Sequence, residues 1–130
     1  MGQTEAERHL KLAKEQLERV QTASWEPQEP EVAVIWSFYA YENGVVAIAE
    51  KLGIKWEKTH ASKVTIATRL YKTGKLSVDV GPTIAELNEL RKDVQYGEPG
   101  PELQAIDMED LATSLENFIT EVENVVTKGN

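Results

Sequence analysis

The segment from residue 31 to 52 constrains the fold more than any other part of this chain, because it is apolar nearly all round a helix. Its apolar residues are Val32, Val34, Ile35, Trp36, Phe38, Tyr39, Val45, Val46, Ile48 and Leu52. A helix without a polar face has to be buried, so we expect this one at the centre of the molecule or in a subunit interface. Its interior polar pair is Glu42-Asn43, and Gly53 is placed to end it.

Four further segments carry apolar residues at helical spacing. The first, within residues 1–22, opens with a capping box of Thr4 and Glu7. The third begins between Trp56 and Thr59 and ends near residue 71, the fourth covers about 82–96, and the fifth follows an N-cap at Asp107. Pro27 and Pro30 punctuate the connection at 22–30, where we expect Trp25 to anchor the loop to the bundle.

These segments predict one all-α domain over residues 1–130, an antiparallel bundle of about five helices. Residues 1–22 would be the amphipathic first helix and 31–126 the bundle core. The longest apolar run, residues 32–41, is too short to cross a bilayer. We therefore expect no membrane segment, and the absence of cysteine suits a cytoplasmic protein.

The net charge of −8 is unevenly distributed. Residues 98–130 carry one lysine against eight acids, whereas residues 55–75 carry six Lys/Arg against Glu57 alone. Overall acidity argues against loose binding of nucleic acid but leaves room for a local basic site. The basic stripe of the third helix is most simply a solvated face, with phosphate binding as the alternative.

Arg91 is the most informative polar residue, because it falls on the apolar stripe of the fourth helix with Ile84, Leu87 and Val94. A guanidinium is costly to bury unpaired, and Glu42 is the obvious partner across the core. Tyr96 lies near the helix end, so Arg91 and Tyr96 could form a small polar site. The alternative is an arginine that reaches out to water.

Other chemistry has little support in the sequence. His9 and His60 are far apart and show no zinc-ligand spacing, so we expect no metal and no cofactor. His60 lies on the apolar side of the third helix, where it is either a hydrogen-bonded core histidine or a ligand. The candidate residues for binding a nucleotide or RNA are Arg91, Lys92, Glu42 and His60, with Arg91 and Tyr96 as candidate catalytic residues.

Three stretches resemble the HEPN (higher eukaryotes and prokaryotes nucleotide-binding) domain family. They are SFYAYENGVVAIAEKLGI at 37–54, THASKVTIATRLYKTGKL at 59–76 and LNELRKDVQYGEP at 87–99. The resemblance implies an all-α bundle that dimerises. It also implies an RNase that uses an R-x4-6-H motif, often in toxin–antitoxin systems or phage defence, with a nucleotidyltransferase partner in some cases. Arg91 matches the motif arginine, but the histidine position falls on Tyr96, Gly97 or Glu98, and Lys92 replaces the usual small polar residue.

Three hypotheses follow from the missing histidine. The first is a homodimeric HEPN-like module that binds a nucleotide, RNA or a partner protein through Arg91 without cleaving RNA. The second is an active metal-independent endoribonuclease in which His60 or Tyr96 replaces the usual base. The third is a purely structural helical interaction protein.

Overall fold

The computed structural model describes residues 4–25, 27–97 and 100–128, which form six helices and no strand. The helices are α1 (Glu5–Ala23), α2 (Pro30–Leu52), α3 (His60–Lys72), α4 (Gly81–Gln95), α5 (Pro101–Gln104) and α6 (Met108–Thr127). The predicted all-α fold is confirmed. The short α5 was not expected: Gly100 enters in an extended conformation and Pro101 starts a single turn, since proline suits the first helical position.

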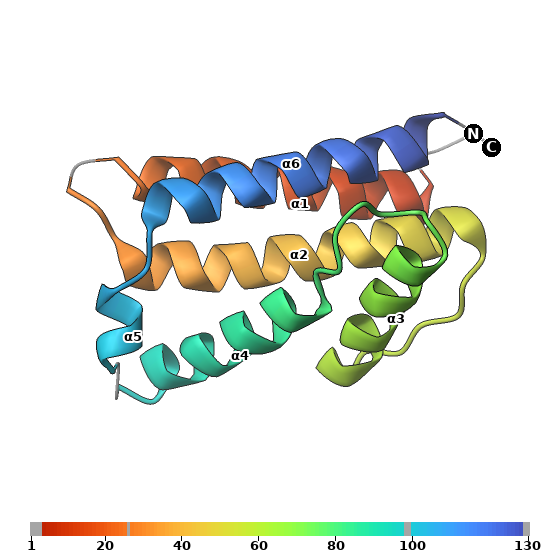
Figure 1. The fold of residues 1–130 in the computed structure, drawn as a ribbon. Helices are drawn as coiled ribbons and strands as arrows, with labels where there is room; N and C mark the ends of the chain where they lie inside the picture. Colours follow the sequence, from red (N-terminus) through yellow and green to blue (C-terminus); the bar gives the residue numbers. More distant parts are fainter. Residues whose placement is uncertain (1–3, 26, 98–99, 129–130) are drawn as a thin grey trace.

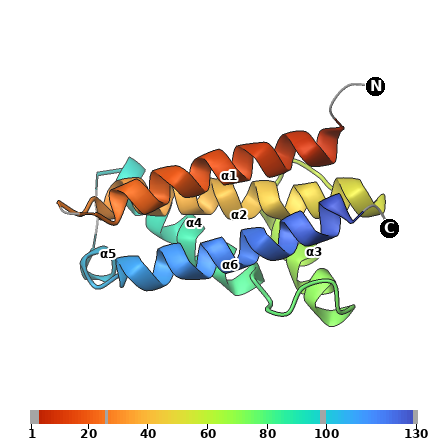
Figure 2. The same cartoon turned by 90° about the horizontal axis from the view of Figure 1, so that it is seen from above.

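Helix α2 is the centre of the molecule. It packs against α1 and α6 on one side and against α3 and α4 on the other, and the described parts of both termini end at the same end of the bundle (Figure 1). Seen from above, α1 and α6 run side by side along α2 (Figure 2). Because α2 contacts all the other helices, its side chains are buried all round, as its composition predicted.

By length and apolar composition, α2 is the one helix in the described ranges that could cross a membrane, but 72% of its most apolar window is buried inside the fold. This burial is what a core helix requires.

The helix ends follow the expected local chemistry. Thr4 and Glu7 form the capping box of α1, and the Asp107 carboxylate accepts a hydrogen bond from the Asp110 amide at the start of α6. Gly53 ends α2 at φ 71°, a left-handed conformation that glycine adopts without strain. Capping therefore fixes where these helices begin and end.

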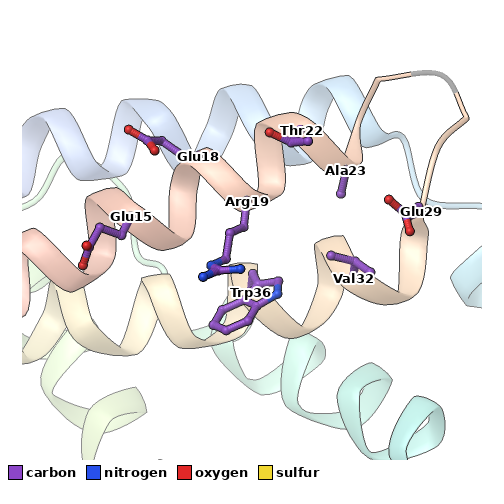
Figure 3. Close-up of a pocket in the computed structure, with 8 residues that line it drawn as sticks. All are labelled: Glu15, Glu18, Arg19, Thr22, Ala23, Glu29, Val32 and Trp36. Carbon is purple, nitrogen blue, oxygen red and sulfur yellow. The ribbon is translucent and has the colours of Figure 1, made fainter.

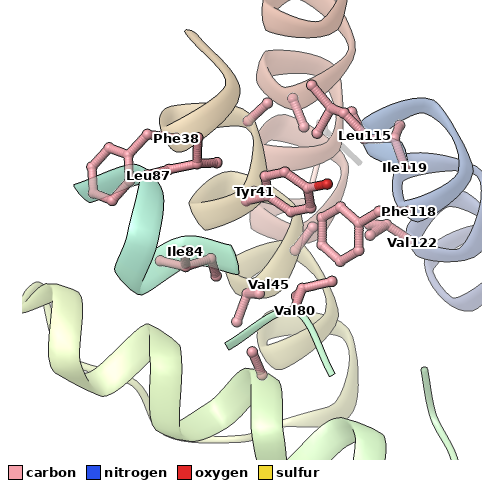
Figure 4. Close-up of a cluster of buried hydrophobic side chains, with 14 of the residues drawn as sticks. Phe38, Tyr41, Val45, Val80, Ile84, Leu87, Leu115, Phe118, Ile119 and Val122 are labelled. Atoms are coloured by element: carbon pink, nitrogen blue, oxygen red, sulfur yellow. The ribbon is translucent and has the colours of Figure 1, made fainter. Parts of the chain in front are cut away.

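A close contact in the core joins α2 to α6. Gly44 faces the Phe118 ring so closely that an added Cβ would lie 2.5 Å from Cε2. Phe118 also packs against Tyr41 with ring centroids 4.9 Å apart (Figure 4). The glycine lets the α6 ring reach the backbone of α2.

The expectation that Trp25 anchors the first connection is wrong. Its side chain is 65% exposed, whereas Ala23 is buried. The reason is that α1 ends at Ser24, so Ala23 makes the last inward contact and the chain then turns out to solvent.

Candidate functional site

Helix α4 holds Arg91 at the seam with α2. Ile84, Leu87 and Leu90 are buried, so the inward face of α4 carries the half-buried Arg91 against the core. The guanidinium carbon lies 4.8 Å from the centre of the Phe38 ring of α2, a cation–π arrangement. The predicted apolar stripe is therefore where the arginine lies.

The Arg91 guanidinium is oriented by its own helix. Nη2 donates to Asn88 Oδ1 at 2.7 Å and Nη1 donates to Gln95 Oε1 at 2.6 Å. The Nε–H is buried without a hydrogen-bond partner among the described residues. Both amide partners are uncharged, so the charge of the arginine remains available to an anion.

The predicted pairing of Glu42 with Arg91 is wrong. Glu42 is 6% exposed, and its carboxylate lies 2.6 Å from His60 Nδ1 and 3.8 Å from Lys63 Nζ. Glu42 is one turn past Phe38 on α2, and it turns toward α3 whereas Arg91 rests on the Phe38 ring. Asn88 and Gln95 already supply acceptors to the guanidinium, so it needs no carboxylate.

His60 is the first residue of α3 and follows the N-cap Thr59. Because a carboxylate can only accept, Nδ1 must be the donor in its bond to Glu42, and Nε2 is left for another group. The His60 side chain is 44% exposed and its ring lies 5.0 Å from the Phe38 ring. It is hydrogen-bonded, as one alternative held, but it is not fully buried.

His60 and Arg91 therefore meet at one aromatic ring. Both groups lie within 5.0 Å of the centre of Phe38. A groove of about 430 Å³ between α3 and α4 is lined by His60 and by Asn88, the residue that orients Arg91. Phe38 thus joins three of the predicted site residues, Glu42, His60 and Arg91, into one cluster.

Lys92 and Tyr96 lie outside this cluster. Lys92 donates to the Glu89 carboxylate at 3.2 Å. Glu89 lines the groove, so Lys92 compensates a negative charge there. Tyr96 follows α4 and is 76% exposed, with no hydrogen bond to Arg91 in the described part of the chain. Glu98 lies outside the described residues.

A polar network that the sequence did not reveal lies behind this site. His9 of α1 is 8% exposed and shares a hydrogen bond of 2.9 Å with Asn43, which also donates to Gln16. The position of His9 next to Leu10, on the buried face of α1, could have indicated from the sequence that His9 is buried. These contacts fix α1 to α2 next to Glu42.

Positive charge is concentrated in the α3 region, on the chain segment 55–75. Lysines and arginines of the α3 region are exposed, namely Lys55, Lys58, Arg69, Lys72 and Lys75. Lys63 instead turns inward to Glu42 and lies 5.8 Å from the Trp56 ring. No group of three metal-ligating side chains occurs within residues 4–25, 27–97 and 100–128.

A different groove, of about 470 Å³, lies between α1 and the first half of α2. Arg19 stacks on Trp36 there at 4.6 Å, with Glu15, Glu18 and Glu29 around it (Figure 3). Arg19 therefore already occupies the face of the Trp36 ring in this groove.

The chain was compared with known proteins. The HEPN domain family model matches residues 4–125, nearly the whole chain. No curated protein matches the chain, and no solved structure matches it.

Proposed function

This chain belongs to the HEPN domain family, and on that premise we propose that it binds the phosphates of RNA or a nucleotide in the groove between α3 and α4. The family is all-α, and its members commonly dimerise and act on or bind RNA. The observation that carries the proposal is the position of His60 and Arg91 on the Phe38 ring beside a groove of about 430 Å³.

Arg91 supplies the main contact from beside the groove, where Nη2 is bound to the lining residue Asn88. A guanidinium has five N–H donors in a planar fork, and only two of them are used by Asn88 and Gln95. Since the Nε–H is buried, a phosphate can accept from the remaining N–H groups of Nη1 and Nη2, and charge-assisted bonds of this kind are about twice as strong as neutral ones. The Phe38 ring shields one side of the guanidinium from water, which strengthens the attraction further.

The exposed lysines and arginines of the α3 region support the same function. They lie on α3 and on the connections before and after it, so they can attract a polyanion to a protein whose net charge is −8. We further propose that the domain works as a cytoplasmic homodimer. A toxin–antitoxin or phage-defence role beside a nucleotidyltransferase-type partner is part of the same proposal.

Fluorescence anisotropy with a short labelled single-stranded RNA tests the binding site. Arg91→Ala should weaken binding about tenfold or more, because it removes a charge-assisted contact worth about 1.5–3 kcal/mol. Arg69→Ala is the matched control: it removes the same charge from an exposed position of α3, whereas Arg91 lies on the Phe38 ring and is bound to Asn88 of the groove wall. If both variants lost the same amount of RNA affinity, RNA would be attracted only by the general positive charge and not bound at Arg91.

RNA cleavage is the second candidate function, and the hydrogen bond between Glu42 and His60 Nδ1 favours it. With Nδ1 held by a buried carboxylate, Nε2 of a neutral imidazole can take a proton from a ribose 2′-hydroxyl. Arg91 would then stabilise the charge that develops on the phosphate. Tyr96 is a weaker candidate for the base, since it is exposed and apart from the groove.

An RNA cleavage assay separates the two candidates. Cleavage that persists in Tyr96→Phe and is lost in His60→Ala and Arg91→Ala would assign the base to His60. If the RNA stays intact with the unmodified chain under conditions where it binds, the chain binds RNA without cleaving it.

A further inference from the structure

Tyr41 of α2 is the floor of a second groove, between α4 and α6. The residue is 2% exposed, yet its side chain lines two adjoining cavities of about 280 and 210 Å³. Figure 4 shows its hydroxyl turned toward α6, beside Phe118. No hydrogen bond to this hydroxyl occurs among the described residues, and its oxygen is not one of the fully buried atoms, so it is open to the cavities that Tyr41 lines.

The groove uses a different face of α4 from the proposed phosphate site. Its α4 wall consists of Thr83, Glu86, Leu87 and Leu90, whereas Ile84, Ala85, Asn88 and Glu89 line the other groove. The two sites can therefore be altered separately.

The charges around Tyr41 are all negative. The carboxylates that line the two cavities belong to Glu86, Asp107, Asp110 and Glu121, and within the described part of the chain no lysine, arginine or histidine lines either cavity. Asp107 is occupied by the α6 cap and Glu121 accepts from Ser77. Glu86 on the α4 wall and Asp110 on the α6 wall are left without a described ion-pair partner.

The other lining residues are mixed: Leu87, Leu90, Ile106 and Leu111 are apolar, whereas Thr83, Ser114 and Asn117 are polar and uncharged. A groove lined by carboxylates and without a cation attracts cations and repels phosphates. Burial, and then the charge of Asp110, raise the pKa of Tyr41 to about 12, so the hydroxyl stays protonated at neutral pH and its oxygen can accept a hydrogen bond.

We propose that this groove binds an organic cation, an ammonium or guanidinium group carried on an apolar arm. Its N–H groups donate to the Tyr41 hydroxyl oxygen and to the carboxylates of Glu86 and Asp110, and its arm lies against the leucines. The same chemistry is found in a free alkylamine and in an arginine or lysine side chain of another protein.

Calorimetric titration with n-butylguanidinium tests the proposal, with n-butylurea as a neutral probe of the same shape. The cation should bind about fivefold more tightly or better, since its charge adds ionic attraction to the carboxylates of Glu86 and Asp110. Asp110→Asn should remove about that factor. Tyr41→Phe should also weaken binding while it keeps the aromatic floor.

Glu109→Gln is the matched control, because Glu109 is an exposed acid on the same turn of α6 that lines neither cavity. Equal binding of the urea and the cation, or equal loss in Asp110→Asn and Glu109→Gln, would overturn the proposal. A second titration with a short peptide that carries one arginine between leucines distinguishes the source. Tighter binding of the peptide than of the free ion indicates a protein-borne cation, and tighter binding of the free ion indicates a small amine.

Discussion

Glu42 matters at the residue scale because it compensates the inward-turned Lys63. The Lys63 side chain is 12% exposed, and its Nζ lies 3.8 Å from the Glu42 carboxylate. Glu42→Leu would leave that ammonium without its carboxylate and with the Lys58 carbonyl as acceptor, which costs about 3 kcal/mol of unfolding free energy. The double variant Glu42→Leu, Lys63→Met should recover much of this loss in urea denaturation. Equal stability of the single and double variants would show that the two residues are not coupled.

Tyr41 should make stability depend on alkaline pH. Its pKa in the folded chain is raised to about 12 by burial, whereas an unfolded tyrosine ionises near pH 10. The unfolded state therefore loses this proton first, and the stabilisation present below pH 10 is lost as the pH rises toward 12. We expect Tyr41 to account for about 1 kcal/mol of the loss in unfolding free energy between pH 9 and 11.

Urea denaturation of the parent chain and of Tyr41→Phe at both pH values isolates this contribution, since the other tyrosines and lysines titrate in both. The variant should lose less stability over this interval. An identical loss of unfolding free energy in both chains would mean that Tyr41 does not cause it.

How far the site could be predicted also depends on single residues. The helical spacing of Ile84, Leu87 and Val94 placed Arg91 at the seam, because periodicity fixes which face is buried. The partner of Glu42 could not be deduced in the same way. The choice between Arg91 and His60 depends on where the Phe38 ring lies between two helices, and no local pattern in the sequence fixes that position.

At the scale of helices, α2 and α6 approach through Gly44. Gly44→Ala would bring a methyl group to 2.5 Å from Phe118 Cε2. Overpacking of a filled core costs about 1–3 kcal/mol, which outweighs the gain of about 1 kcal/mol that alanine brings to a helix interior. Thermal denaturation should show lower stability for Gly44→Ala and recovery in Gly44→Ala, Phe118→Leu. A more stable Gly44→Ala chain would mean that the two helices separate easily at this contact.

The helices differ in how well the sequence predicts them. Helices α1 and α6 combine a clear apolar stripe with a side-chain cap, and α2 is apolar throughout, so each was evident. The turn α5 was missed because four residues are too few to show a period. The exposure of Trp25 was missed because large apolar residues are usually buried, whereas the end of α1 at Ser24 directs this one outward.

At the scale of the whole molecule, the α3 region is basic and the α6 region is acidic. Residues 98–130 carry eight of the 22 acids and only one of the 14 Lys/Arg. We expect light scattering at micromolar concentration to give the mass of a dimer, as the HEPN family implies. The mass of a monomer would contradict the proposed dimer, and each groove would then act within a single chain.

The most direct test of the phosphate site is an NMR titration that observes the Arg91 Nε–H, whose buried position lacks a partner among the described residues. Addition of a short RNA or a mononucleotide should shift this resonance together with those of Asn88 and His60, and Arg69 should change little. Shifts confined to α1 and α6, or no shift at saturating RNA, would contradict the account.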